Sequence, residues 1–230
     1  MQLKDPLVSK STHPLPPLEN GDRLTRLEFE RRYQAMPQIK KAELIEGVVY
    51  MGSPLRFQAH AQPHFLMIGW LAAYQAATPG VMGGDNPTVR LDDDNEPQPD
   101  IILRIEQGSS TITDDDYLHG APELVVEIAA SSASIDLRDK WRAYRRNGIQ
   151  EYLVWQVYEQ QILWFYLQEG DYQRLLPAQQ GILKSQVFPG LWLNEQAMIK
   201  GDMGQVLAAV QQGIQTPEHP RFVEQLQTRS

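Results

Sequence analysis

The stretch ELVVEIAASSASIDLRDKWRAYRRNG, residues 123–148, carries the strongest fold signal in the sequence. It begins with an apolar run that is typical of a buried strand and contains one charge near its end, Glu127. Its second half has the start and stop signals of a helix, because Ser134 suits the N-cap and Gly148 the position just past the last turn. We therefore predict a central strand, a short turn and a helix over residues 134–147.

Glu127 needs a partner if the strand is buried. Alternate side chains of a strand face opposite ways, so Glu127 shares its face with Val125 and Ala129. A carboxylate among apolar side chains is costly unless something pairs with it, and a divalent metal is one such partner. Asp100, at the mouth of the apolar run PDIILRI, raises the same question. The alternative is that Glu127 lies at a frayed strand end and that Asp100 caps a turn.

Lys140 can meet Glu127 if the helix folds back along the strand. From Glu127 the chain advances about 13 Å to Ser131 at ~3.3 Å per residue, and the helix from Ser134 returns about 9 Å by Lys140 at ~1.5 Å per residue. The two side chains then end nearly level. The alternative is that Lys140 lies at the surface and pairs with Asp136, one turn earlier.

The rest of the chain mixes helices and strands. A helix is predicted over residues 57–77, and a shorter one over 24–36 with a capping box of Thr25 and Glu28. A further helix is predicted over 195–213. Predicted strands are 42–51, as a pair around a Glu46-Gly47 turn, then 88–91 and 99–105, joined by a turn, and 123–129, 151–158, 161–168 and 171–177, with a loop over 110–122. This order indicates an α/β (α+β) fold, a mixed sheet flanked by helices.

One domain accounts for most of the chain. Residues 1–22 are rich in proline and polar residues and predict an extended arm. Residues 23–213 form the predicted domain, and residues 214–230 are expected to be a polar tail.

Bulk properties narrow the class of protein. The absence of cysteine excludes disulfides and thiolate metal sites. A net charge of −8 disfavours a protein that coats nucleic acid non-specifically, but not a nuclease with a local basic patch. The longest apolar stretch, residues 65–77, is shorter than the roughly 20 residues of a membrane helix, and the N-terminus lacks an apolar signal core. We expect a cytoplasmic protein that does not enter the membrane.

Three blocks carry a family resemblance. AELIEGVVYMGSP (42–54), PQPDIILRI (97–105) and the block from 121 to 155 resemble the Uma-type endonucleases, a former domain of unknown function within the PD-(D/E)XK superfamily. The resemblance extends over about residues 24–193 and is most specific in the third block. It implies a restriction-endonuclease-like fold and a Mg²⁺-dependent endonuclease that hydrolyses DNA, with Mn²⁺ able to substitute.

The resemblance also implies a site. Asp100 matches the first acidic position of the superfamily motif and Glu127 the second, whereas Ala129 stands where the motif has lysine. The resemblance to the Uma-type group implies that the motif lysine has moved from the strand to the following helix. Lys140 matches that position in this sequence. Asp100, Glu127 and the backbone carbonyl of Ile128 would hold Mg²⁺, and Lys140 would orient water or stabilise charge on the phosphate.

Four further residues are candidates. Glu43 resembles the family's N-terminal glutamate, which would complete the catalytic metal site or bind its water; the alternative is a solvated residue at the start of a hairpin. His60 resembles a family histidine that would touch substrate or act as an acid; the alternative is a structural helix histidine. The segment from Asp136 to Arg146 has five basic and two acidic residues, a local net charge of +3. We take it as a candidate DNA-facing patch in which Arg138 and Arg142 bind substrate, although a solvated helix surface fits as well.

The sequence leaves two other functions open and predicts a homodimer. The alternatives are a catalytically silent binding or structural protein that keeps the nuclease fold, and a phosphodiesterase for a small phosphate ester. The aromatic residues of the segment 151–168 exceed what one sheet face buries, so we expect a homodimer through this hairpin.

Overall fold

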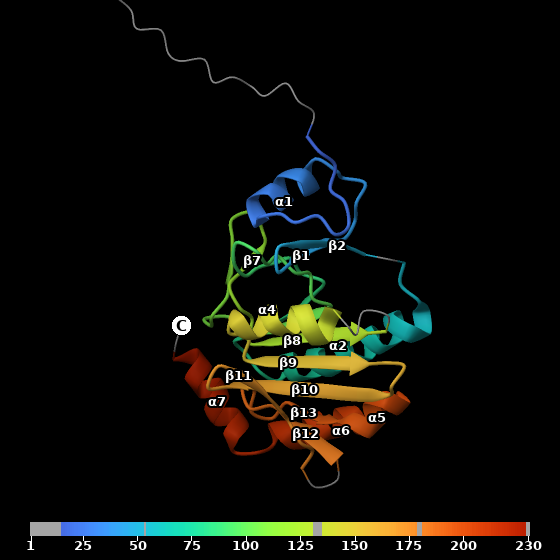
Figure 1. Ribbon diagram of the computed structural model, residues 1–230. Coiled ribbons are helices and arrows are strands. Elements are labelled where there is room, and N and C mark those ends of the chain that lie inside the picture. The colour runs from blue at the N-terminus through green and yellow to red at the C-terminus, as the bar shows by residue number, and fades with distance from the viewer. Residues whose placement is uncertain (1–14, 53, 131–134, 179–180, 229–230) are drawn as a thin grey trace, which may run out of the picture.

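The computed structural model describes residues 15–52, 54–130, 135–178 and 181–228. Its centre is a six-stranded mixed sheet in the order β11-β10-β9-β8-β5-β3, in which β8 and β9 are parallel and all other neighbours antiparallel. Figure 1 shows this sheet in the middle of the molecule. The strands are β3 (Val81–Asp85), β5 (Ile101–Ile105), β8 (Leu124–Ala129), β9 (Glu151–Gln156), β10 (Gln161–Gln168) and β11 (Asp171–Arg174). The predicted mixed sheet flanked by helices is confirmed.

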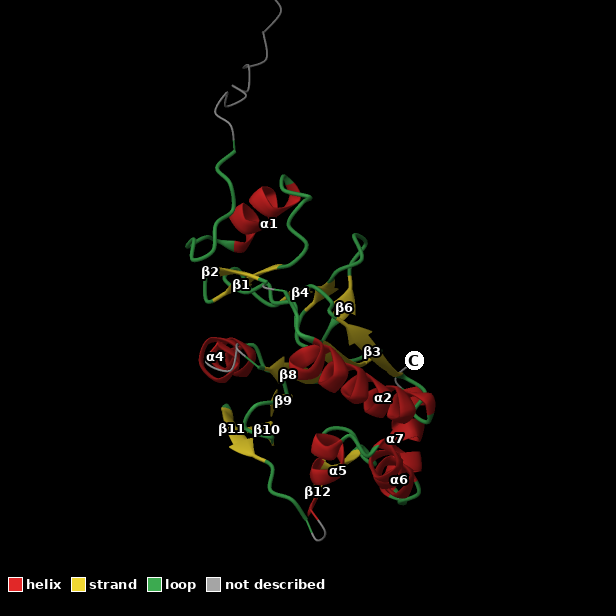
Figure 2. Cartoon of the chain, turned by 90° about the vertical axis from the view of Figure 1, so that its right-hand side faces the viewer, coloured by secondary structure: helices red, strands yellow, loops and turns green. Residues whose placement is uncertain are grey.

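The alternation along β8 divides the core as predicted. Leu124, Val126 and Ile128 belong to the large apolar cluster on one face of the sheet, whereas Val125 and Ala129 belong to the cluster on the other. The large cluster includes side chains of α2 (Gln62–Ala76), α5 (Glu195–Lys200) and α6 (Met203–Ile214), and η1 (Phe57–Ala61), a π-helical turn, leads directly into α2. The opposite face is covered by η2 (Asp136–Lys140), also π-helical, and α4 (Trp141–Arg146). Figure 2 separates α4 on one side from α2, α5 and α6 on the other.

The crossover from β8 to β9 explains why the chain folds back. Parallel neighbours need a connection that returns along the sheet, and η2 with α4 is that connection. The predicted helix over 134–147 is therefore present but begins as a π-helical turn; Ser134 lies outside the described residues. Gly148 follows the last turn with φ +78°, as its predicted role requires.

The structure weakens the dimer argument from the aromatic hairpin but leaves part of it, because Tyr158 is 59% exposed. Tyr152, Trp155 and Trp164 are buried within this chain because both faces of the sheet are covered. The homodimer stays a prediction.

The C-terminal region differs from expectation in two ways. The predicted helix 195–213 is divided into α5 and α6, because Gly201 adopts φ +74° and the Asp202 side chain accepts a hydrogen bond from the Gln205 N–H as a new N-cap. Within the predicted polar tail 214–230, Glu218–Gln227 forms α7. Its buried Leu226 belongs to the large core cluster. The helix was missed because its amphipathic pattern contains few apolar residues.

The N-terminal segment forms a small unit at one end of the sheet (Figure 1). It contains α1 (Arg26–Gln34) and the hairpin β1 (Ala42–Ile45) and β2 (Val48–Met51), around its own apolar cluster. Thr25 is the N-cap of α1, but its side chain makes no capping bond; Glu28 accepts hydrogen bonds from Arg31 and Arg32 instead. The capping box was therefore wrong, because two arginines on the same helix compete for that carboxylate.

Short strands complete the fold. The predicted strand 88–91 is β4, which pairs with β7 rather than with its sequence neighbour β5. The predicted loop 110–122 contains two short strands. The short strands outside the central sheet and the N-terminal hairpin are β4 (Val89–Arg90), β6 (Thr111–Ile112), β7 (Leu118–His119), β12 (Ile182–Lys184) and β13 (Trp192–Asn194). In the described part of the chain no helix has the length and apolar character to cross a membrane.

Candidate active site

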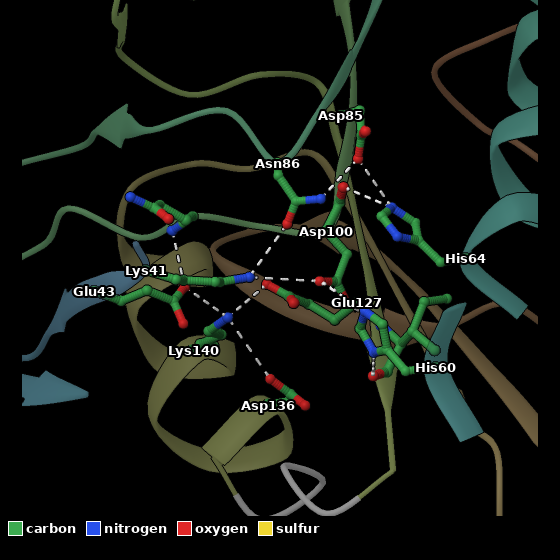
Figure 3. Close-up of polar contacts among 12 residues, drawn as sticks. Lys41, Glu43, His60, His64, Asp85, Asn86, Asp100, Glu127, Asp136 and Lys140 are labelled. Atoms are coloured by element: carbon green, nitrogen blue, oxygen red, sulfur yellow. Dashed lines mark hydrogen bonds and ion pairs between the residues drawn. The ribbon is translucent and has the colours of Figure 1, made fainter. Parts of the chain in front are cut away.

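Four separate segments bring charged side chains to one point (Figure 3). Lys140, the last residue of η2, places its Nζ 2.9 Å from Glu127 Oε1 on β8 and 2.9 Å from Glu43 Oε1 on β1. Asp136, one turn earlier, is 3.9 Å from the same ammonium. Lys140 is only 4% exposed and Glu127 3%. Glu127 is therefore not at a frayed strand end and Lys140 is not at the surface, whereas the expected pair between Lys140 and Asp136 is present.

Asp100 lies on the other side of Glu127, directly before β5. Its Oδ2 accepts a hydrogen bond from the Ile128 N–H at 2.8 Å, which fixes the carboxylate against β8. Its Oδ1 has longer contacts, 3.5 Å to His60 Nε2 and 3.6 Å to Lys41 Nζ. The predicted residues Asp100, Glu127, Lys140 and Glu43 thus share one cluster.

His60 reaches the cluster from η1. Its Nδ1 lies 3.3 Å from the Ile128 carbonyl, and a neutral ring that donates there carries a lone pair on Nε2 toward Asp100 Oδ1. Burial lowers the pKa of His60, although Asp100 opposes the shift. A lone pair and a carboxylate oxygen that face each other leave a position suited to a proton or a cation.

Negative charge predominates here. The carboxylates of Glu43, Asp100, Glu127 and Asp136 share the space with Lys140 and Lys41. Burial raises the pKa of Glu127 to about 8; Lys140 opposes this shift, and the neighbouring carboxylates add to it. Burial would lower the pKa of Lys140, but Glu127, Glu43 and Asp136 outweigh it and raise that pKa well above its ordinary value. A divalent cation would relieve this excess.

The donor set fits a hard metal ion. Asp100 Oδ1, the Glu127 carboxylate and the Ile128 carbonyl are oxygen donors of the kind Mg²⁺ takes, with water completing its shell. Among the described residues no group of three or more His, Cys, Asp or Glu side chains is arranged to hold a metal by itself. A metal here would therefore depend on the backbone carbonyl and on water or phosphate oxygens.

Two site residues were missed from the sequence. Lys41 precedes Glu43 by two positions, so both point to the same side of the hairpin strand; its Nζ also lies 3.3 Å from Asn86 Oδ1. Tyr144, four residues after Lys140 on the same helix face, donates its hydroxyl to Glu127 Oε1 at 2.9 Å. Both spacings were visible in the sequence.

The predicted basic patch is smaller than its charge count suggests. Arg145 pairs with Asp171, and Arg146 with Glu46 and Asp92, so neither arginine is available to a phosphate without losing a partner. Arg138 and Arg142 are exposed and line one open hollow of about 550 Å³ on the outer face of η2 and α4, although Arg142 also pairs with Asp139. The other residues of its lining are Ile135, Leu137, Asp139 and Trp141.

Comparisons with known proteins concern the fold and the family of the chain. The chain resembles a crystal structure described as a putative nuclease belonging to DUF820 from Anabaena variabilis ATCC 29413, with a TM-score of 0.52 and 13% identity. The match covers 74% of this chain and 97% of that one, and at this identity it speaks for the fold. No curated protein matches the chain. The family model Uma2, described as "putative restriction endonuclease", matches residues 27–196, and the chain belongs to that family.

Proposed function

We propose that this protein is a metal-dependent nuclease that hydrolyses phosphodiester bonds of DNA. The observation that carries the proposal is the meeting of Asp100, which directly precedes β5, Glu127 on β8 and Lys140 on η2 in one buried cluster with surplus negative charge. The family's description as "putative restriction endonuclease" supports the nuclease class.

Each residue then has a distinct task. Asp100, Glu127 and the Ile128 carbonyl would hold one Mg²⁺, or Mn²⁺ in its place. When bound, the ion would polarise the scissile phosphate and lower the pKa of a bound water. Tyr144 and Lys140 both donate to Glu127 Oε1 and so fix the orientation of that carboxylate.

Lys140 and Lys41 divide the cationic work. Lys140 is enclosed by three carboxylates and would orient the attacking water or stabilise charge that develops beside it. The Lys41 side chain is 31% exposed, against 5% for that of Lys140, and therefore offers its ammonium to a phosphate arriving from solvent. Arg138 and Arg142 would contact the DNA backbone further along η2 and α4.

The test is cleavage of plasmid and oligonucleotide DNA with Mg²⁺ or Mn²⁺, comparing wild type with Glu127→Ala. The proposal requires metal-dependent cleavage by the wild type and its loss in the variant. If several DNA forms remain uncut and neither metal binds, the chain is a silent binding or structural protein with a nuclease fold.

The depth of the cluster favours one second candidate, a phosphodiesterase that acts on a small ester. The side chains of Asp100, Glu127 and Lys140 are 4–6% exposed, so a small substrate would reach them with less rearrangement than a duplex. Turnover of a chromogenic phosphodiester without cleavage of duplex or single-stranded DNA would favour this candidate.

A further inference from the structure

A second hollow, of about 470 Å³, lies beyond the C-terminal ends of β8 and β9. It is formed between the start of η1 and the turn that joins β9 to β10, and it is lined by Arg56, Gln58, Ala59, Val157 and Tyr158. Its volume falls within the ~300–1,000 Å³ of pockets that bind small ligands. It shares no lining residue with the hollow at Arg138 and Arg142.

Two backbone connections place this hollow beside the carboxylate cluster. The Val157 N–H donates to the Ala129 carbonyl at 3.0 Å, and Ala59 directly precedes His60, whose ring contacts the Ile128 carbonyl. Ala129 follows Glu127 by two residues, about 7 Å along the strand, so the hollow lies close to the carboxylate cluster. A strand whose phosphate sits at the cluster can therefore reach the hollow with a neighbouring nucleotide.

The lining suits a flat aromatic ligand that carries negative charge nearby. Tyr158, which is 59% exposed, and the exposed Arg56 both line the hollow. Leu55 and Phe57, the sequence neighbours of Arg56, are 64% and 72% exposed but are not part of the lining. A tyrosine ring with an adjacent guanidinium is the combination on which nucleobases stack in single-strand-binding proteins. Bases inside a continuous duplex do not present a free face.

We propose that this hollow binds an unpaired nucleobase of the substrate strand, so that single-stranded or locally unpaired DNA is the preferred substrate class. The inference rests on the proposed nuclease function and adds to it the form of DNA that is recognised. Tyr158 and Arg56 are binding residues in this proposal and do not touch the reacting phosphate.

The experiment measures DNA binding in EDTA, where cleavage does not occur, by fluorescence anisotropy. The probes are a labelled single-stranded oligonucleotide, the blunt duplex of the same sequence, and that duplex with one bulged nucleotide. Tyr158→Ala is expected to weaken binding of the single-stranded and bulged probes about 5- to 150-fold, the effect of losing one stacked base, and to leave the blunt duplex within a few-fold. Tyr158→Phe keeps the ring and should bind like wild type, whereas Arg56→Ala should weaken the same two probes.

Leu207→Ala is the control, because Leu207 is an exposed apolar side chain on α6 outside the hollow. Equal weakening of all three probes by Tyr158→Ala, or no weakening, would overturn the pocket while cleavage by the wild type left the nuclease proposal intact. A change in oligomeric state with unchanged DNA binding would make this surface a contact between copies of the chain. If the wild type neither binds nor cuts any probe, the nuclease proposal itself fails, and the pocket with it.

Discussion

Two glutamates on neighbouring parallel strands, Glu127 on β8 and Glu151 on β9, are both buried, and burial raises the pKa of both, to about 8 and about 7. Their surroundings differ. Glu151 accepts hydrogen bonds from the Ser185 hydroxyl and from the N–H groups of Gln186 and Val187, and so anchors a loop. Glu127 faces one ammonium and one phenol among three other carboxylates.

The comparison separates a structural carboxylate from a functional one. Burial and a raised pKa occur in both, so neither property identifies a site. Neutral donors from one loop satisfy Glu151, and nothing there calls for a further ligand. Around Glu127 the charges come from β1, β5, β8 and η2 and do not balance, which is an arrangement that costs stability unless a cation joins it.

The largest expected difference between the two glutamates is in DNA cleavage. Glu127→Gln and Lys140→Met should each lower kcat by about 10³-fold, because electrostatic groups at a reacting phosphate contribute on this scale. Glu151→Gln should retain activity within a few-fold once its folding has been checked by circular dichroism. Comparable losses in all three variants would mean that the sites do not differ in function.

Lys41 extends the comparison to the entrance of the site. Lys41→Ala should lower kcat/KM for DNA about 10- to 100-fold, the cost of one charged hydrogen bond to phosphate. Lys40→Ala is the matched control, since Lys40 precedes it by one residue and contacts only the Pro37 carbonyl in the described structure. A Lys40 effect as large as that of Lys41 would show a general charge effect.

The raised pKa of Glu151 should be visible in how the unfolding free energy depends on pH. Its folded pKa, about 7, lies above the unfolded value of 4.5, so the unfolded chain ionises first as pH rises and stability falls through this interval. The shift corresponds to about 3 kcal/mol. Urea unfolding at pH 5 and pH 8 should therefore give a smaller loss of unfolding free energy in Glu151→Gln than in wild type. An equal loss in both proteins would contradict the assigned pKa.

Mg²⁺ should stabilise the folded protein only through the Glu127 cluster. At ten times the dissociation constant, binding adds about 1.4 kcal/mol, which raises the Tm of a domain of this size by ~3–6 °C. Wild type and Glu151→Gln should respond alike, whereas Glu127→Gln should not. A Tm increase that survives Glu127→Gln would place the metal elsewhere.

Sequence reasoning recovered what depends on short-range geometry. The alternation of β8 and the rises of strand and helix were enough to bring Lys140 level with Glu127. It failed where segments far apart in the chain meet. Arg146 is neutralised by Asp92, 54 residues earlier, and β4 pairs with β7 instead of β5. Lys41 was missed because its place in the site depends on a contact with Asp100, which is 59 residues later in the chain. The sequence alone does not show that these two residues meet.

Because of the two π-helical turns, the directions of the site side chains are set separately from the packing of the following helices on the core. A π-helical turn holds one residue more than an α-helical turn, and such insertions are frequent at functional sites. In η1 the Ala61 N–H bonds to the Arg56 carbonyl, five residues back, just beside His60, and η2 ends on Lys140. Each insertion shifts the register between a site residue and the helix that follows it. The apolar faces of α2 and α4 can therefore pack on the sheet in one rotational orientation, while the side chains of His60 and Lys140 point toward β8 in another.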